Sequence, residues 1–245
     1  MTRQLLALAA LFAVVAVGAP ALRLEWMYLG LGGALFLAVA YLANPAAWAG
    51  RRLALALLVA YLVHQFEEHG FDLLGHRYAF QASANAVLGP VLGCAPGAEC
   101  PLTVDAIFWV NTLLVWWPYA LAVLFGARRP AMVVAVSGLT LANAIAHVVP
   151  AVLKGAYDPG LLTAVLLFVP VGALTWRTAR RRWGAHRQTL GLAFAWGALG
   201  HPLLLVGAFA VYSRGLAPGW AYPVFLVAYA SLPLAAPTAK LFSRS

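Results

Sequence analysis

Long apolar stretches, separated by short polar segments, run along nearly the whole chain. A stretch of about 17–25 apolar residues is long enough to cross a bilayer as a helix. Eight such stretches can be placed, at about residues 4–22, 26–47, 53–70, 105–126, 131–153, 160–177, 189–212 and 218–239. The pattern predicts an all-α fold, a polytopic transmembrane bundle of about eight spans that forms a single domain over residues 1–245.

The first stretch has a second interpretation. It carries Arg3, an apolar core and the small residues Gly18-Ala19-Pro20-Ala21, which are features of a cleaved secretory signal. Its apolar core is long for a signal peptide, so we expect a retained helix. Cleavage would leave seven spans and would not change the orientation of the others.

The composition excludes a soluble domain. Of the 245 residues, 64% are hydrophobic and 9% are charged, whereas a soluble domain has about 25% charged residues. The net charge is +9, but the positive residues lie at the ends of the apolar stretches, where membrane topology places them. We therefore expect membrane lipids as partners, and no nucleic acid.

The distribution of Lys and Arg predicts the orientation. With the N-terminus in the cytoplasm, twelve of the 16 basic residues face inward and four face outward, as the positive-inside rule requires. The C-terminus is then also cytoplasmic. The inward set is Arg3, Arg51, Arg52, Arg128, Arg129, Arg177, Arg180, Arg181, Arg182, Arg187, Lys240 and Arg244, and the outward set is Arg23, Arg77, Lys154 and Arg214. We expect a multi-pass protein of a bacterial inner membrane.

The longest polar stretch, residues 70–104, becomes an outer-side loop in this topology. It holds both cysteines of the chain, Cys94 and Cys100. An oxidising compartment would allow a disulfide between them. Two free thiols are the alternative, and a zinc site is less favoured because no histidine lies near them.

The third stretch ends in the run His64-Gln65-Phe66-Glu67-Glu68-His69, although the chain has only seven acidic residues. Ionisable side chains within a membrane are costly and usually functional. On a helix, His64, Glu67 and Glu68 are spaced i, i+3, i+4 and share one side. A straight helix turns His69 away from His64, so both would bind one ion only if the helix were distorted.

Other polar side chains fall at a similar depth. Asn143 and His147 are spaced i, i+4 in the fifth stretch, Asn111 lies near the outer end of the fourth, and His201 lies in the seventh. Tyr157 belongs to a turn before the sixth. These positions predict one composite site in the outer half of the bundle. The structural alternatives are a polar cap for His64, Glu67 and Glu68, and ordinary helix–helix hydrogen bonds for the others.

Three motifs together resemble the HXXEE-domain family of bacterial integral membrane proteins. They are His64-x-x-Glu67-Glu68, Asn143-x-x-x-His147 and Tyr157-x-Pro159-Gly160, and the resemblance covers roughly residues 50–210. It implies that His64, Glu67, Glu68, Asn143 and His147 are the positions that matter. It implies no substrate.

The leading hypothesis is a metal-dependent membrane enzyme that acts on a lipid or a small apolar substrate. The expected ligands of a divalent metal ion are His64, Glu67, Glu68, His147 and His201. Mixed nitrogen and oxygen ligation suits zinc, which we favour slightly, or non-haem iron. With zinc, the reaction would be hydrolysis: the glutamate that does not bind the ion, Glu67 or Glu68, would be the general base, and Asn143 or Tyr157 would orient a carbonyl or oxyanion. With iron, it would be oxidation.

Three further hypotheses stay open. Adjacent carboxylates at Glu67 and Glu68 could leave one of them protonated, which would allow a metal-free isomerase or cyclase. The same residues could serve a carrier or sensor of protons or metal ions. A structural subunit, in which the motif serves assembly, is the last. The oligomeric state cannot be read from the sequence.

Overall fold

A computed structural model describes residues 25–95, 97–236 and 242 of the chain. The first apolar stretch, 4–22, and the choice between a signal peptide and a retained helix therefore lie outside the described residues. The described part is a helical bundle, which confirms the all-α class. Each of the seven other apolar stretches forms a helix within the bounds given below.

The first half of the bundle consists of α2 (Trp26–Ala43), α3 (Arg52–Gln65) and a helix in three parts. That helix begins as α5 (Val104–Trp109), widens into the π-helical segment η3 (Val110–Trp116) and continues as α6 (Trp117–Phe125). A short 3-10 helix, η1 (Pro45–Trp48), joins α2 to α3, and another, η4 (Gly126–Arg128), follows α6. At its lower end α3 continues as a π-helical turn, η2 (Phe66–Gly70).

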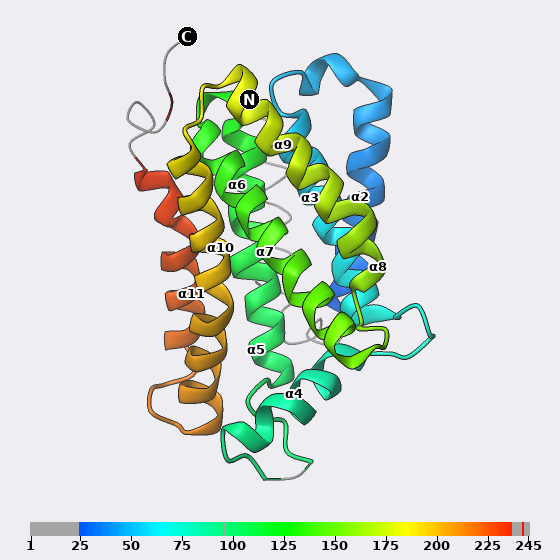
Figure 1. Ribbon diagram of the computed structural model, residues 1–245, viewed down its shortest axis with the longest axis vertical. Coiled ribbons are helices and arrows are strands. Elements are labelled where there is room, and N and C mark those ends of the chain that lie inside the picture. The colour runs from blue at the N-terminus through cyan, green and yellow to red at the C-terminus, as the bar shows by residue number, and fades with distance from the viewer. Residues whose placement is uncertain (1–24, 96, 237–241, 243–245) are drawn as a thin grey trace.

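The second half begins with α7 (Pro130–Lys154). Next comes a long helix composed of α8 (Leu161–Thr163), the π-helical η5 (Ala164–Phe168) and α9 (Val169–Arg182). The chain then forms α10 (Arg187–Ala208), its π-helical extension η6 (Phe209–Ser213), α11 (Ala221–Ser231) and the 3-10 turn η7 (Leu232–Ala235). In Figure 1, α7 runs through the centre of the molecule, with α10 and α11 on one side and α2 and α3 on the other.

In the described part of the chain, five helical stretches are long and apolar enough to cross a membrane. They are Trp26–Ala43, Val104–Phe125, Pro130–Lys154, Leu161–Arg182 and Arg187–Ser213. The apolar stretch Ala221–Ala235 is shorter. These lengths and compositions indicate a membrane protein. The number of spans and the side that each end faces stay predictions.

The central helix α7 packs against α6, α9 and α10. The crossing of α7 and α10 is close because glycine occupies the contact on both helices. A Cβ atom at Gly138 would lie 2.3 Å from the backbone oxygen of Ala193, and one at Gly197 would lie 2.5 Å from the Cα atom of Leu139. Small residues at such crossings allow membrane helices to approach each other.

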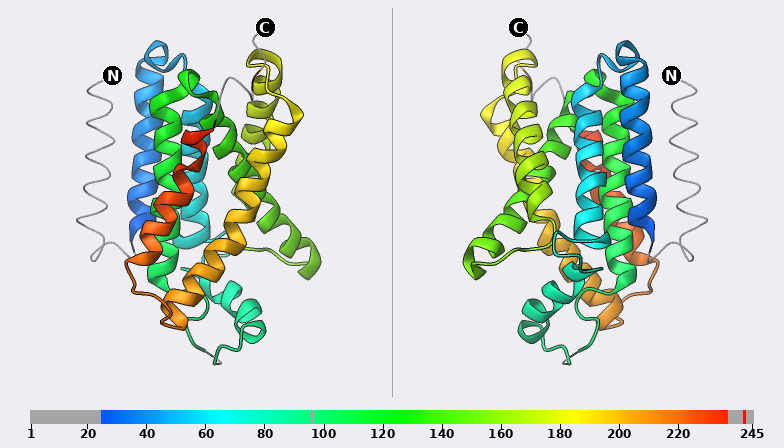
Figure 2. Two further views of the ribbon diagram at one scale, coloured as in Figure 1. Left: turned by 90° about the vertical axis from the view of Figure 1, so that its left-hand side faces the viewer. Right: turned by 90° about the vertical axis from the view of Figure 1, so that its right-hand side faces the viewer.

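The segment 70–104, predicted as a loop, contains an additional helix, α4 (Ala79–Val91). It lies at the lower end of the bundle, at the level of the lower end of α10 (Figures 1 and 2). Its 13 residues are too few for a span, so the pattern of span-length apolar stretches does not predict it. The loop after α4 holds a disulfide between Cys94 and Cys100.

Candidate functional site

The π-helical turn η2 determines how the HXXEE run is displayed. Its widened ring is closed by a hydrogen bond from the Phe71 N–H to the Phe66 carbonyl, at 3.1 Å. Such turns insert an extra residue into a helix and occur often at functional sites. The distortion that His69 requires is therefore present, and Nε2 of His69 lies 3.1 Å from Oε2 of Glu68.

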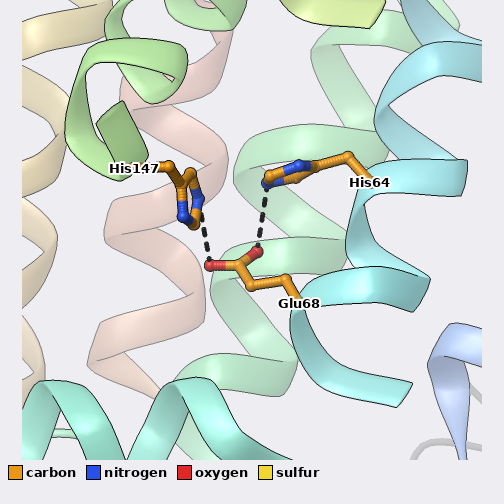
Figure 3. A group of neighbouring side chains, drawn as sticks. All are labelled: His64, Glu68 and His147. Carbon is orange, nitrogen blue, oxygen red and sulfur yellow. Dashed lines mark ion pairs between the residues drawn. The ribbon is translucent and has the colours of Figure 1, made fainter. Parts of the chain in front are cut away.

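Glu68 is the centre of a buried cluster. Its Oε2 atom lies 3.5 Å from Nε2 of His64, and its Oε1 atom lies 3.6 Å from Nε2 of His147. Figure 3 shows the two imidazoles facing the carboxylate from α3 and α7. The side chains of His64 and His147 are at most 2% exposed. One nitrogen or oxygen of each of these three residues lies within 4.8 Å of the others, which is close enough to share a metal ion.

A second partner fixes the far side of each imidazole. Nδ1 of His147 lies 3.2 Å from Oδ2 of Asp158, and Nδ1 of His64 lies 2.9 Å from Oγ1 of Thr163. Because a carboxylate only accepts, Nδ1 of His147 carries its hydrogen. The Thr163 hydroxyl donates to Glu67 and therefore accepts from His64. Both Nε2 atoms are left with a lone pair toward Glu68, which is how metal-binding histidines are usually held.

Glu67 points away from the cluster. Its Oε1 atom accepts from the Tyr157 hydroxyl at 2.7 Å and from the Leu162 N–H at 3.1 Å. Its Oε2 atom accepts from the N–H of Thr163 at 2.8 Å and from that residue's hydroxyl. A carboxylate is favourable at a helix N-terminus, here the start of α8. The structure therefore gives Glu67 the position of a cap, and its hydrogen bonds reach the cluster through Thr163 and His64.

Tyr157 shares this role. It lies between α7 and α8, and its hydroxyl oxygen accepts from the Leu73 N–H at 3.1 Å while it donates to Glu67. Burial, and then the hydrogen bond to Glu67, raises the pKa of Tyr157 above its ordinary value. The side chain therefore remains a donor at neutral pH. It is placed to hold Glu67, and the cavity described below does not include it in its lining.

Gly160 explains why the loop before α8 passes so close to the cluster. Its φ is +92°, and a Cβ atom there would lie 2.8 Å from Cε1 of His64 and 2.9 Å from Cε1 of His147. Glycine satisfies both the backbone conformation and the steric demand. The Tyr157-x-Pro159-Gly160 motif thus belongs to the same site as the histidines.

A family model described as "Protein of unknown function with HXXEE motif" matches residues 55–175. The chain belongs to this family. No curated protein and no solved structure matches the chain. The HXXEE match includes all three members of the buried cluster, together with Asp158, Gly160 and Thr163. His201 lies beyond the matched segment.

Beyond the HXXEE match, His201 joins the site through one amide. Its Nε2 atom lies 3.0 Å from Oδ1 of Asn143, and Nδ2 of Asn143 lies 3.2 Å from Nε2 of His64. The other ring nitrogen of His201 lies 2.9 Å from the Gly197 carbonyl. The structure therefore brings Asn143 and His201 to the site, as expected, but it places His201 outside the group of possible ligands.

Several residues of the HXXEE site were not assigned from the sequence. Asp158 is the variable residue of the Tyr157-x-Pro159-Gly160 motif. No motif or spacing in the sequence indicated a role for Thr163. His69 is held by a chain of hydrogen bonds from Trp116 to Gln65 and from Gln65 to Asn111, whose Nδ2 atom lies 3.1 Å from Nε2 of His69. The sequence signals of this network are Gln65 and His69 in the HXXEE run and Asn111 in the fourth apolar stretch.

A cavity of about 290 Å³ adjoins the cluster. Its polar wall is formed by five side chains, Glu68, His69, Asn111, Asn143 and His201. The rest of the lining is mainly apolar and comes from α3, α4, the α5–η3 helix, α7 and α10. The helix α4 contributes Phe80, Ala84 and Leu88, which are spaced four residues apart and so share one face. The HXXEE site therefore joins a polar end to an apolar chamber.

Proposed function

We propose that this protein is a metal-dependent integral membrane enzyme that acts on a lipid or another apolar substrate. His64, Glu68 and His147 would hold a divalent ion, and the substrate would occupy the adjoining cavity. One observation carries the proposal: two histidines, each anchored through Nδ1, direct Nε2 at one buried carboxylate beside an apolar chamber.

The electrostatics of Glu68 support a bound cation. A buried carboxylate is costly unless it is paired. In the described part of the chain no Lys or Arg pairs with Glu68, and its ionic partners are the imidazoles of His64, His69 and His147. Nδ1 is already protonated in both His64 and His147. The lone pair on each Nε2 atom therefore faces a carboxylate oxygen of Glu68. An added proton would relieve one such contact, whereas a shared metal ion would relieve both.

The donor set restricts the ion. Two imidazole nitrogens and one carboxylate oxygen suit catalytic zinc, and the same set suits non-haem iron. We favour zinc and a hydrolytic reaction. A zinc ion in such a site supplies Lewis acidity and an activated water.

Other residues of the site would orient the substrate and transfer a proton. Asn143 and Asn111 line the cavity beside the cluster and would orient a polar group of the substrate. Glu67 is not available as a general base, because both of its oxygens are engaged at the start of α8. The proton-transfer role therefore passes to His201 or His69, which are the two histidines in the cavity lining.

Iron-dependent oxidation is the second candidate. It is favoured by the same two-His, one-carboxylate set. It is also favoured by the cavity wall, in which Glu68 is the only carboxylate among the described residues. Hydrolysis usually needs a second group to move a proton, and oxidation at a facial triad does not need a second carboxylate.

The metal-free isomerase has less support. That hypothesis requires Glu67 and Glu68 to repel each other within one site, but their carboxylates face different partners. A carrier of protons or metal ions stays an alternative. It predicts ion uptake into proteoliposomes that depends on Glu68, which an enzyme would not produce.

The substrate would be small or would enter by one apolar segment. A cavity of about 290 Å³ is at the lower end of the range of about 300–1,000 Å³ for ligand pockets. Its lining has far more apolar than polar side chains, and three of the helical stretches that line it, Val104–Phe125, Pro130–Lys154 and Arg187–Ser213, are apolar enough for a membrane. A single acyl or isoprenoid segment, with a polar group directed at Glu68, matches this division.

Metal analysis of the detergent-purified protein tests the proposal. We expect one zinc or iron per chain in the wild type and less than about a tenth of that in His64→Ala and His147→Ala, because each removes one of three protein ligands. His76→Ala is the matched control, since His76 is an exposed histidine beside Asp72 and lies outside the cluster. Absence of a stoichiometric metal, or equal content in all four proteins, would refute the metal centre.

A further inference from the structure

The end of the bundle opposite the HXXEE site carries a groove lined by arginines. Arg51 and Arg52 come from the start of α3, and Arg177, Arg181 and Arg182 come from the last turns of α9. We call this recess of about 700 Å³ the arginine groove. We propose that it binds the phosphate group of an anionic phospholipid. The proposal is independent of the metal centre.

Four of the five arginines in this groove have no acidic partner among the described residues. None of the residues that line it is acidic. Within the described residues, Arg52, Arg177, Arg181 and Arg182 have no carboxylate within ion-pair distance. All seven acidic residues of the chain lie elsewhere in the sequence, at Glu25, Glu67, Glu68, Asp72, Glu99, Asp105 and Asp158. Arg52, Arg177, Arg181 and Arg182 therefore place four positive charges at one recess that has no acidic residue in its described lining.

Helix dipoles do not account for the arrangement. Arginines in the last turn of α9 are favourable there, because the C-terminal end of a helix is partially negative. Arg51 and Arg52 are at the opposite kind of end: Arg51 precedes the first turn of α3, which has no side-chain cap. Positive side chains are unfavourable at a helix N-terminus, whereas anions are favourable. A bound anion would be favourable at the start of α3 and would pair with the arginines of both helices.

The side-chain type points to phosphate. All five basic residues of the groove are arginines. The planar guanidinium group forms paired hydrogen bonds with phosphate oxygens, which lysine cannot do. Thr178 also lines the groove and offers a hydroxyl.

The remaining lining favours a lipid as the source of that phosphate. The floor consists of Leu53, Ala54, Val133 and Leu174, and Leu174 is 53% exposed. Trp183 stands at the end of α9, and Trp is enriched where membrane helices meet the headgroup layer. Basic pockets between membrane helices are known to bind anionic headgroups. A lipid would place its phosphate on the arginines and its chains along the exposed apolar face of α9.

Two double variants distinguish lipid binding by the groove arginines from lipid binding by positive charge elsewhere on the same end of the molecule. Arg181→Gln/Arg182→Gln removes two charges that line the groove. Arg177 is left unchanged because it lines both the groove and the neighbouring recess. Arg180→Gln/Arg187→Gln removes two charges from the same end of the molecule, but these arginines line a separate recess between α9 and α10. Each variant would be compared with the full-length wild type by native mass spectrometry, with phosphatidylglycerol and phosphatidylcholine as probes.

We expect the wild type to retain one phosphatidylglycerol under conditions that remove phosphatidylcholine. The groove variant should bind phosphatidylglycerol about tenfold more weakly, since two charge-assisted contacts are lost, and the control variant should stay within about twofold. Equal losses in the two variants would overturn the proposal, as would equal retention of both lipids. Competition by inorganic phosphate as strong as that by the lipid would show a soluble phosphate ligand and overturn the lipid assignment. Metal content, measured in the same samples, reports separately on the HXXEE site.

Discussion

At the scale of single residues, the two adjacent glutamates of the motif have different surroundings. Glu68 faces the imidazoles of His64, His69 and His147, whereas Glu67 accepts hydrogen bonds from Tyr157, Leu162 and Thr163. One carboxylate is therefore suited to hold a cation and the other to hold the start of a helix. The motif needs both glutamates, but for different reasons.

Exchanging each glutamate for glutamine should separate these roles. Glu68→Gln removes a charged ligand and should abolish stoichiometric metal binding. Glu67→Gln would turn an amide N–H₂ group toward Tyr157, Leu162 and Thr163, which all donate hydrogen bonds at this position. We therefore expect the free energy of unfolding to fall by about 1–3 kcal/mol. The metal content should stay nearly unchanged. Thermal unfolding in detergent and metal analysis, performed on both variants, measure the two effects. Metal loss in Glu67→Gln as complete as in Glu68→Gln would contradict the division.

Asp158 should influence the metal centre without touching the ion. It holds Nδ1 of His147 and thereby keeps Nε2 directed at Glu68. Loss of such a partner typically weakens metal binding by about 10–100-fold. We expect Asp158→Asn to fall in that range when metal affinity is measured by competition with a chelator. Asp72→Asn is the control, because Asp72 is also a buried carboxylate beside a histidine, His76. Equal effects of the two variants would show that Asp158 has no special role.

At the scale of elements, the site depends on two deviations from regular helix. The first is the π-helical turn η2, which ends α3 and places His69 against Glu68. The second is the loop between α7 and α8, which carries Asp158 and Gly160 to the two histidines. The regular helix α7 supplies Asn143 and His147, and α3 supplies His64. The π-helical turn supplies Glu68, and the loop completes the site.

These deviations decide what could be predicted from the sequence. Spacing of i, i+4 correctly grouped His64 with Glu68, because both ring and carboxylate project from one side of the same helix. A regular α-helix through residue 70 would also place Glu67 beside His64 and Glu68. The π-helical turn and the start of α8 instead give Glu67 other partners. Short polar positions such as Thr163 act through contacts between distant segments, which spacing along one helix cannot show. The helix α4 was missed because only span-length stretches were sought.

The loop glycines provide a test at this scale. Gly155 and Gly160 both have positive φ, at +59° and +92°, so alanine at either position costs about 1–2 kcal/mol of backbone strain. Only at Gly160 would the added Cβ also press on His64 and His147, whereas at Gly155 no heavy atom lies within 4 Å. We expect Gly160→Ala to lose metal and Gly155→Ala to keep it, in samples matched for folded protein. Equal metal content in the two variants would argue against a site built around this loop.

At the scale of the whole molecule, opposite charges occupy opposite ends. The lower end of α3 and the loop before α8 hold the carboxylates and histidines of the HXXEE site, and the arginine groove lies at the start of α3 and the end of α9. This separation follows from the alternating direction of successive helices. It is also what the positive-inside rule requires if the groove faces the cytoplasm.

Reporter fusions test this orientation directly. A phosphatase that matures only in an oxidising compartment should be active when fused after Gly97, in the disulfide-containing loop that follows α4, and inactive when fused after Arg128 or Arg182. The bias of twelve inward against four outward basic residues supplies the reason. A fluorescent reporter that folds only in the cytoplasm serves as the control and should give the opposite pattern at each position. If the phosphatase is active after Arg128 and inactive after Gly97, the bundle is inverted. The HXXEE site would then open toward the cytoplasmic side, and the arginine groove would face the outer layer of lipids.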